Sequence, residues 1–405
     1  MKRTGPVVPT MVAAAMCSAL LSGCGDGDLA GASGEGGVKL CASVEQTGGA
    51  ASLGGWFEQG LEVATQEINS GDGLIVDGKK VPFELVVADN ESNPETGLAV
   101  QKRFEQAGCK FIFAPALATL AGPILESTRN TDDTLMLTIA SSAVPHLGTD
   151  KGANLFMPKL DFPYALPTVV EAAADRYAPK TAAVVMAQDA SGEAQQAAIV
   201  KALEERGIKV VYDDFFDPAT RDFAPYIDKI KRTDPDMVFA GYVDSMVSPI
   251  LKAAVEAGFT QPVFVGTSGV SSKAFADNPG IPNGVVALSG RAVDVTDDPD
   301  VQAYRDAFAE RYGSPPTESG SSWGVLYYES IRMLAKAMEI AGTTDDLTSI
   351  SKAMTTDEAG DYEGRTIDMT FDAKHHAFHS SQVGFVNAGQ ISEYALIEPK
   401  TRSSE

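Results

Sequence analysis

The sequence predicts an α/β protein made of two doubly wound parallel-sheet lobes. From Val38 onward, short apolar strands alternate with segments of helical periodicity, which is the pattern of βαβ units and parallel sheets. A chain of 405 residues is long enough for two or three globular units, and 44% hydrophobic residues are enough to fill their cores. No Pro-rich linker divides the halves, so we expect strands to cross between the two lobes.

Residues 1–23 are predicted to be a secretory signal. Lys2 and Arg3 precede an uncharged, mostly apolar run that reaches Cys24. The letters LSGC at the end of this run resemble the lipobox of bacterial lipoproteins, in which the cysteine becomes the lipid-modified first residue. The alternatives are an uncleaved transmembrane helix and a plain signal with a chance cysteine. Residues 24–37 are Gly-rich and acidic, and they predict a flexible tether.

The first lobe begins with the strand VKLCASV, followed by a Gly-rich turn and a helix with one apolar face. After the strand FELVVADN, Asn93 offers an N-cap, Pro94 suits the first helical position, and Gly108 is a C-cap signal. The strand KFIFAPA, a helix near residues 121–129 and the strand TLMLTIAS complete this first array.

A second array shows the same alternation and predicts the second lobe. Its strands are TAAVVMAQ, IKVVYDDFF, DMVFAGY and PVFVGTS, and its helices are expected near residues 164–177, 192–206, 223–233 and 246–257. The remainder of the chain contains helical patterns near residues 300–312, 323–341 and 347–354, and then the β-rich stretches GRTIDMTFD and SQVGFVNAG.

Only Cys41 and Cys109 remain to form a disulfide in the mature chain, because Cys17 leaves with the signal and Cys24 is the acylation candidate. Export permits a disulfide. Both cysteines sit in predicted strands, and in parallel neighbouring strands their offset would be poor for disulfide geometry. Two buried free thiols are therefore favoured, and a disulfide is the alternative.

The charge of the chain argues against nucleic acid as a partner. Lys and Arg number 32 and Asp and Glu number 55, and the resulting net charge of -23 repels phosphate backbones. The sequence contains no P-loop, and the glycines of GDGDLAG follow no strand, so a dinucleotide fingerprint is absent. We expect no cofactor.

Two short motifs of hydrolases are present, and neither predicts an enzyme. Gly320 to Gly324 match G-x-S-x-G, but the loop SPPTESG precedes the serine where a nucleophile elbow needs a strand. Ser349 to Lys352 match S-x-x-K without a K-T-G or S-D-N partner. An exported hydrolase is thus an alternative that only turnover by the purified protein would revive.

Three of the four histidines, His375, His376 and His379, are close together in the sequence. Imidazole groups are ligands for transition metals. No cysteine or tight carboxylate cluster adjoins them, and the context TFDAKHHAF indicates a strand followed by an exposed turn. We therefore expect no metal site here.

Several characteristic stretches occur in a fixed order: TGGAASLGGWFEQGLEVATQEINSGDGL, FAPALATLAGP, LTIASSAVPHL, DFAPYIDKIKRTDPDMVFAGY and MTFDAKHHAF. In order and spacing they resemble the extracytoplasmic solute-binding proteins of branched-chain amino-acid-type ABC importers. These are type I periplasmic binding proteins related to the Leu/Ile/Val-binding protein. The resemblance covers nearly all of the mature chain, although each stretch alone is modest.

The resemblance implies two lobes joined by three crossovers, near Phe156, residues 285–289 and residues 370–378. The first lobe would contain residues 38–156 and 286–370, and the second would contain residues 157–285 and 371–405. A small polar solute, either an amino acid or a related carboxylate or amide, would be enclosed between the lobes and delivered to an ABC permease.

The same resemblance implies a protein that works outside the cytoplasm, and the LSGC stretch implies that a lipid anchor holds it at the cell membrane, in the periplasm or on the outer face of the cytoplasmic membrane. We expect a monomer. Within this fold the alternative function is a receptor that reports ligand occupancy to a membrane kinase or regulator. A neighbouring permease gene would favour import, and a lone kinase gene would favour sensing.

Ligands of open α/β sheets bind at the carboxyl ends of strands, where helix N-termini present free N–H groups. In the family, first-lobe turns hold a ligand carboxylate through backbone amides and hydroxyl groups, and the matching residues are Ala118, Thr119, Ala140, Ser141 and Ser142. Helix capping is the alternative role of these hydroxyl groups. Trp56 would stack on or cover the apolar part of the ligand, with ordinary helix packing as the alternative.

The matching second-lobe positions are Ser191, Tyr242, Asp244 and Ser268. Amino-acid binders of the family commonly have an aromatic residue in place of Ser191. They also have an acid in place of Ser268, which pairs with the ligand ammonium. A buried ammonium without a counter-charge is costly. Asp189 or Asp244 would have to supply that charge, so we do not expect free α-amino acids to be clearly preferred over analogues lacking the amine.

Overall fold

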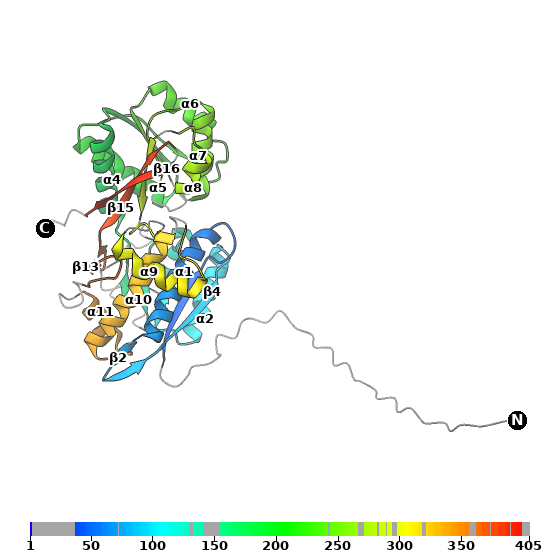
Figure 1. Ribbon diagram of the computed structural model, residues 1–405, viewed down its shortest axis with the longest axis vertical. Coiled ribbons are helices and arrows are strands. Elements are labelled where there is room, and N and C mark those ends of the chain that lie inside the picture. Colours follow the sequence, from blue (N-terminus) through cyan, green and yellow to red (C-terminus); the bar gives the residue numbers. More distant parts are fainter. Residues whose placement is uncertain are drawn as a thin grey trace.

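The computed structural model contains two α/β lobes stacked along the long axis of the molecule, with chain segments running between them (Figure 1). It describes Met1 and residues 37–71, 73–128, 133–140, 147, 154–241, 244–265, 271–281, 283–288, 290–293, 298–317, 321–355, 362–372, 374–388 and 390–398. In this part of the chain no helix is long and apolar enough to cross a membrane.

The first lobe is built on a parallel sheet with β1 (Val38–Val44) inside it. Cys41 of β1 is in register with Val86 of β4 on one side and with Ile112 of β5 on the other. The strand order is β4 (Phe83–Asp89), β1, β5 (Phe111–Phe113), β6 (Leu135–Leu137) and β7 (Leu155–Phe156). All pairs in this sheet are parallel, which confirms the predicted class of sheet.

Helices cover both faces of this sheet. On one face, α2 (Pro94–Gln106) and α3 (Ala118–Thr128) share a core with Cys41 and Ile112. The other face packs against α1 (Ala51–Ser70), α9 (Pro299–Tyr312), α10 (Ser322–Ala341) and α11 (Leu347–Met354). The predicted N-cap is confirmed, since the Asn93 side chain accepts hydrogen bonds from the amides of Glu95 and Thr96 at 2.9 and 3.1 Å.

The helices α1 and α10 pack at very short range, although they lie far apart in the sequence. A Cβ atom on Gly60 would lie 2.0 Å from the carbonyl oxygen of Gly324, so this contact requires glycine. Farther along the pair, the Tyr328 hydroxyl donates to the Glu67 carboxylate at 2.5 Å. The first lobe is therefore completed by a helix that belongs to the last quarter of the chain.

A short hairpin precedes β4 and was not predicted. It pairs β2 (Leu74–Val76) with β3 (Lys79–Val81) in antiparallel register. Asp77 and Gly78 both have positive φ, at 51° and 71°. An Asp-Gly pair in this conformation is typical of a two-residue hairpin turn, and this is the signal that sequence reasoning overlooked.

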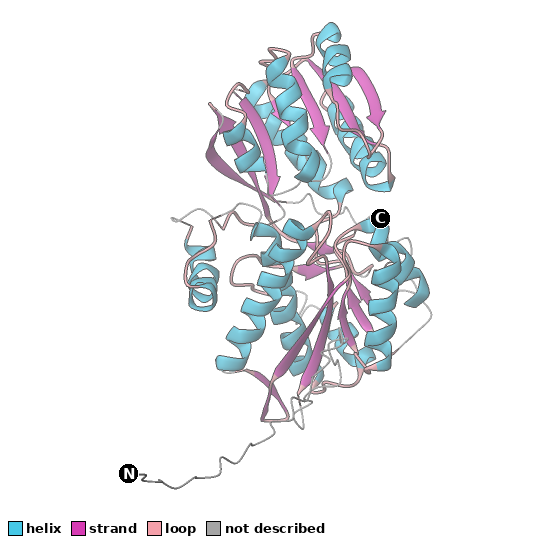
Figure 2. Cartoon of the chain, turned by 90° about the vertical axis from the view of Figure 1, so that its right-hand side faces the viewer, coloured by secondary structure: helices cyan, strands magenta, loops and turns pink. Residues whose placement is uncertain are grey.

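The second lobe contains a larger sheet that has helices on both faces (Figure 2). Its order is β16 (Gln390–Ile397), β15 (Ser381–Asn387), β12 (Asn283–Leu288), β11 (Val263–Phe264), β10 (Met237–Gly241), β8 (Thr181–Ala187) and β9 (Lys209–Phe216). The strands β8 to β12 are parallel to one another, whereas β15 is antiparallel to both β12 and β16. One core lies under α4 (Phe162–Tyr177) and α5 (Ala190–Glu205), and the other lies under α6 (Ala224–Thr233), α7 (Asp244–Glu256) and α8 (Ser271–Asp277).

The chain crosses between the lobes three times, as the resemblance implied. It leaves the first sheet at β7 and enters the second lobe at α4. It returns after β12, since Val293 is buried in the first-lobe core. It then passes through β13 (Thr370–Phe371) and β14 (Ala377–Phe378) to β15. The predicted fold of two doubly wound lobes with three crossovers is confirmed.

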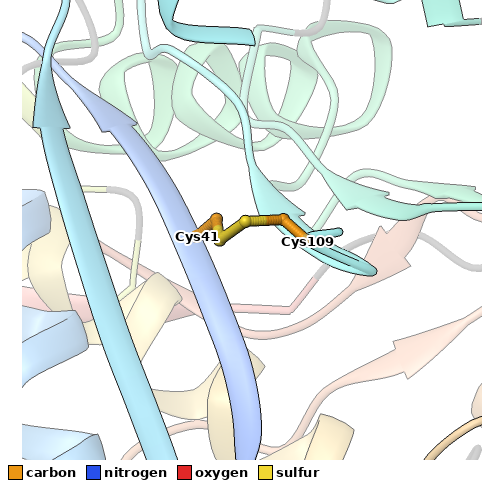
Figure 3. The surroundings of a disulfide bond; sticks show 2 residues. All are labelled: Cys41 and Cys109. Carbon is orange, nitrogen blue, oxygen red and sulfur yellow. A yellow bond between two sulfur atoms is a disulfide. The ribbon is translucent and has the colours of Figure 1, made fainter. Parts of the chain in front are cut away.

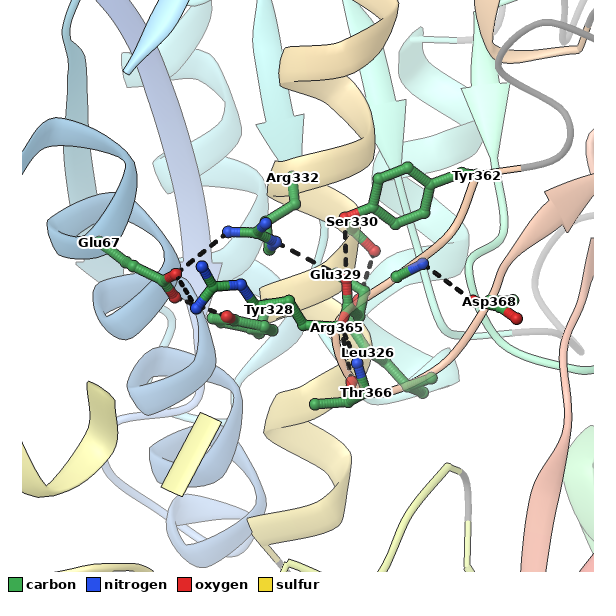
Figure 4. A network of polar contacts seen from close by, with 11 residues as sticks. Glu67, Leu326, Tyr328, Glu329, Ser330, Arg332, Tyr362, Arg365, Thr366 and Asp368 are labelled. Atoms are coloured by element: carbon green, nitrogen blue, oxygen red, sulfur yellow. Dashed lines mark hydrogen bonds and ion pairs between the residues drawn. The ribbon is translucent and has the colours of Figure 1, made fainter. Parts of the chain in front are cut away.

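The segment before the third crossover is anchored to α10 by a buried polar network (Figure 4). Glu329 is fully buried, and its Oε1 accepts hydrogen bonds from the Thr366 amide and hydroxyl, both at 2.7 Å. Its Oε2 accepts from the Tyr362 hydroxyl at 2.9 Å, and Nε of Arg332 lies 3.9 Å away. This carboxylate therefore has side-chain donors on both oxygens and a cation beside it.

Cys41 and Cys109 form a disulfide, so the preference for two free thiols was wrong (Figure 3). The sequence argument placed both cysteines in strands. In the structure β5 begins at Phe111, and Cys109 lies in the turn after α2, where its amide donates to the Phe104 carbonyl. The strand register does not fix its position, and the two Cα atoms are 6.2 Å apart, within the range for a disulfide.

Candidate functional site

The carboxyl ends of the parallel strands lie where the two lobes meet. The chain passes directly from the carboxyl end of β7 into the second lobe, and all strands of the first sheet are parallel to β7. It returns from the carboxyl end of β12, which is parallel to β11. We call these two borders the facing edges. Because ligands bind outside such edges in open α/β sheets, their turns form the candidate site.

Asp89, the last residue of β4, holds the turn that follows β1. Its Oδ1 accepts hydrogen bonds from the amides of Gln46, Thr47 and Glu91, and its Oδ2 accepts from the Thr47 hydroxyl at 2.7 Å. Partial burial opposes ionisation, but these donors together hold the pKa of Asp89 below its usual range. The carboxylate fixes two neighbouring turns of the facing edge in one arrangement.

Glu45 follows β1 directly and is only 1% exposed. Its Oε1 accepts a hydrogen bond from the amide of Leu117, 3.1 Å away, at the start of α3. Burial raises the pKa of Glu45 to about 7, and hydrogen bonds from backbone amides and from Asn90 offset part of that effect. Sequence reasoning missed this residue. The available signal was an acid placed immediately after a buried strand.

The first-lobe residues predicted from the resemblance lie on this edge where they are described. Ala118 begins α3, and Thr119 next to it is exposed. Ala140 follows β6, is buried, and its amide donates to the Thr138 hydroxyl at 3.1 Å. Ser141 and Ser142 lie outside the described residues. Ala118 and Thr119 thus directly follow Leu117, whose amide is hydrogen-bonded to the Glu45 carboxylate.

Trp56 is 7% exposed and belongs to the first-lobe core. Its carbonyl oxygen packs against Gly324 near the start of α10. The Trp56 side chain is therefore part of the packed core at the first turns of α1. Contact between Trp56 and a ligand stays a prediction.

On the second facing edge, Ser191 lies in the first turn of α5 and its hydroxyl accepts a hydrogen bond from Gln195 at 3.2 Å. Asp189 is the N-cap of this helix, and its Oδ1 accepts from the Gly192 amide at 2.9 Å. Asp244 is the first residue of α7. Tyr242 and Ser268 lie outside the described residues. One of the two acids considered as a replacement counter-charge is thus already engaged as a helix cap.

Lys159 in the first crossover is a second residue that sequence reasoning missed. It is 7% exposed, and its ammonium lies 3.9 Å from the centre of the Phe162 ring and 5.6 Å from that of Trp323. Burial lowers its pKa to about 8, while nearby Asp161 favours the charged form. A positive charge is therefore buried beside aromatic rings at the junction of the lobes.

The three clustered histidines connect the third crossover to the first. The His375 ring stacks on Phe156 with 4.2 Å between ring centres, and the Leu160 amide donates to Nε2 of His379 at 3.0 Å. Nε2 of His376 lies 4.0 Å from Asp161. Burial lowers the pKa of His379 to about 4, so it is neutral at pH 7. Within the described residues no group of three or more metal-binding side chains occurs.

Both hydrolase motifs lie at helix starts in the described chain. Ser322 of the G-x-S-x-G motif is the first residue of α10 and is fully buried, and Gly320 lies outside the described residues. Ser349 of the S-x-x-K motif donates its hydroxyl hydrogen to Asp346, the N-cap of α11, at 2.6 Å. Ser349 therefore contributes to the start of a helix.

Two doubly wound lobes with facing strand ends and three crossovers form the architecture of type I periplasmic binding proteins. The family model described as periplasmic binding protein matches residues 37–390, so the chain belongs to this family, in its Leu/Ile/Val-binding-like branch. The chain is 25% identical over 339 residues to a leucine-, isoleucine-, valine-, threonine- and alanine-binding protein from Pseudomonas aeruginosa. That match covers 83% of this chain and 86% of the relative.

Solved structures share the fold at lower identity. A leucine-binding protein from Thermotoga maritima has a TM-score of 0.73 and 18% identity, over 89% of this chain and 99% of that one. A solute-binding protein of an ABC transporter from R. palustris, in complex with benzoate, has a TM-score of 0.74 and 18% identity, over 91% and 98%. The family is one of extracytoplasmic binding proteins that work with ABC transporters, so this chain is a solute-binding protein.

Proposed function

We propose that this protein captures a small solute with a carboxylate or similar acceptor group between its lobes and delivers it to an ABC importer. The observation that carries the proposal is the start of α3 on the first facing edge. There, the exposed Thr119 hydroxyl lies beside the N-terminus of a helix, whose first N–H groups have no partner within the helix. Such a position suits one small anion or amide.

The proposed contacts come from both facing edges. In the first lobe they are Trp56, Ala118, Thr119, Ala140, Ser141 and Ser142, and in the second they are Ser191, Tyr242, Asp244 and Ser268. The ligands named for relatives support this class, since both leucine and benzoate carry a carboxylate.

We also propose that a ligand amine is not required. Ser268 stands where amino-acid binders of the family have an acid, and Asp189 already caps α5. The buried ammonium of Lys159 at the junction of the lobes disfavours a second positive charge nearby. A solute without a cationic group therefore suits the site at least as well as an amino acid.

The test is calorimetry on matched ligands, L-leucine against 4-methylpentanoate, with benzoate as a third probe. We expect leucine and its deaminated analogue to bind within about threefold of each other, less than about 1 kcal/mol. Thr119→Ala should weaken every carboxylate that binds by about fivefold, corresponding to one lost hydrogen bond. Loss of binding on removal of the amine, and loss of leucine binding in Asp244→Asn, would show that an acid does pair with the ligand.

Small-angle scattering would test whether the two lobes close on the solute. We expect a smaller radius of gyration with a saturating ligand than without it, because the crossovers act as a hinge. An unchanged radius with proven ligand binding would contradict closure.

We further propose that Cys24 carries a lipid anchor and that the anchored protein is a monomer. Cys24 lies outside the described residues, and the proposal rests on the LSGC stretch after an apolar run. Cys24→Ala should move the protein from the membrane fraction to the soluble fraction or leave an uncleaved precursor. Unchanged lipid labelling of the variant would contradict the anchor.

A further inference from the structure

The carboxylate of Glu45 already occupies part of the donor set at the start of α3. It accepts from the Leu117 amide at 3.1 Å, and the amides of Ala116 and Glu45 itself also stabilise its charged form. Leu117 precedes Ala118 and Thr119, the first residues of the helix. A carboxylate belonging to the protein therefore lies beside the N–H groups that the proposed function assigns to the solute.

The surroundings of Glu45 supply few charges to compensate its own. The side chain is 1% exposed, and no cationic side chain of the described residues is among the main influences on it. The polar side chains that face it are Asn90, from the turn after β4, and Tyr327 of α10. Asp89 is an acid on the same turn system, and its Oδ1 accepts hydrogen bonds from the amides of Gln46 and Thr47 just after Glu45.

We propose that Glu45 is a positioning residue whose protonation state sets the arrangement of the backbone donors at residues 116–119. When Glu45 is ionised, its charge holds the Leu117 amide in a charge-assisted hydrogen bond. When it takes up a proton from solvent, the hydrogen bond weakens and the carboxyl group becomes a donor itself. The inference rests on the proposed function only for the identity of the solute.

A solute carboxylate bound at Ala118 and Thr119 adds a second negative charge beside Glu45. Two carboxylates that share one buried site do not both stay ionised at moderate pH, because the like charges raise one pKa strongly. Anion binding is therefore linked to proton uptake by Glu45. Above the pKa of the free protein, the affinity for an anion falls about tenfold for each pH unit.

The first experiment needs no ligand. The amide proton and nitrogen shifts of Leu117 are followed by NMR from pH 5 to pH 9 in the wild-type protein, in Glu45→Gln and in Glu95→Gln. Glu95 is an exposed acid at the start of α2 and serves as the matched control. We expect one titration of Leu117 with a midpoint near pH 7 in the wild type and the control, and a flat profile in Glu45→Gln.

A Leu117 amide that does not titrate in the wild type, or that titrates equally in Glu45→Gln, would overturn the proposal. Glutamine keeps an acceptor oxygen for the Leu117 amide, so the Glu45→Gln variant should stay folded. If Glu45 had only a structural role and another group caused the titration of Leu117, that titration would persist in the variant.

The second experiment measures the linkage with benzoate as the probe. Calorimetry at pH 7.5 in two buffers of different ionisation enthalpy should show proton uptake on benzoate binding by the wild type and none by Glu45→Gln. Binding without proton uptake by the wild type would overturn the linkage. If neither benzoate nor 4-methylpentanoate binds any variant, the proposed solute class fails, and the Leu117 titration still decides the role of Glu45.

Discussion

The first lobe buries a glutamate in each of two regions, and their surroundings differ. Glu329 on α10 receives three hydrogen bonds from side-chain and backbone donors and lies 3.9 Å from an arginine nitrogen. Glu45 on the facing edge receives backbone amides and has no cationic partner in the described chain. Burial raises the pKa of both groups. The comparison separates an acid that serves the architecture from an acid placed where a ligand is expected.

The largest change in stability is expected from Glu329→Ala, which tests whether Glu329 is the structural acid of the pair. Removing this carboxylate leaves the donors of Thr366 and Tyr362 without their buried acceptor, and it removes the negative charge 3.9 Å from Nε of Arg332. We expect a loss of about 3–5 kcal/mol in the free energy of unfolding, measured with urea. Glu310→Ala on the exposed side of α9 is the control and should change stability by less than about 0.5 kcal/mol. A loss of stability in Glu329→Ala as small as that in the control would contradict the structural role that distinguishes Glu329 from Glu45.

The next largest change in stability is expected from replacing Glu45, and here the substitution stabilises the protein. Its folded pKa of about 7 lies above the ordinary value of 4.5, so the folded protein binds the proton more tightly than the unfolded chain. Stability is therefore lost as the pH rises from 4.5 to 7, and the loss persists above pH 7. We expect Glu45→Gln to stabilise the protein by up to about 3 kcal/mol at pH 8 and by almost nothing at pH 4. Thermal unfolding at both pH values checks this, and a pH-independent effect would contradict it.

The buried His379 makes stability depend on pH in the acid range. The folded pKa of His379, about 4, lies below the ordinary 6.5, so the unfolded chain binds the proton more tightly. Stability is lost as the pH falls from 6.5 toward 4, by about 2 kcal/mol between pH 7 and pH 4.5. His379→Gln should remove this dependence, whereas the exposed-side control Glu310→Ala should retain it. An equal acid slope in both variants would assign the dependence to other groups.

The smallest effect tests how the Glu329 network is shared among its donors. Tyr362→Phe removes one hydroxyl that donates to Oε2 and leaves the Thr366 donors on Oε1. We expect a cost of about 1 kcal/mol, typical of a single buried hydrogen bond. A loss as large as that of Glu329→Ala would show that the network acts as one unit, and double-variant unfolding would measure the coupling.

Local signals in the sequence predicted most of the fold. The alternation of apolar strands and helical patterns, and the Asn93 and Pro94 capping signal, depend on neighbouring residues and are confirmed. The pairing of Leu160 with His379 joins residues 219 positions apart, and no local pattern reports it. The disulfide was misjudged because Cys109 lies in a turn whose position depends on the packing of α2.

The sequence was sufficient to predict that the candidate site lies at the carboxyl ends of the strands. Ala118, Thr119 and Ala140 follow buried strands, and the rule on carboxyl ends places them on one edge. Glu45 and Lys159 were not found, because the burial of a charged side chain is decided by what packs over it. In both cases that cover includes α10, which contributes Tyr327 and Trp323.

The disulfide has a consequence for the order in which the protein is built. A chain that crosses the membrane from its N-terminus exposes Cys41 and Cys109 long before α10 and the third crossover emerge. The bond joins residues 68 positions apart and encloses the end of β1, α1, the β2–β3 hairpin, β4 and α2. These elements can thus be linked covalently before α10, the helix that packs on α1, has crossed the membrane. The oxidising compartment would then retain a half-built lobe until the last quarter of the chain arrives.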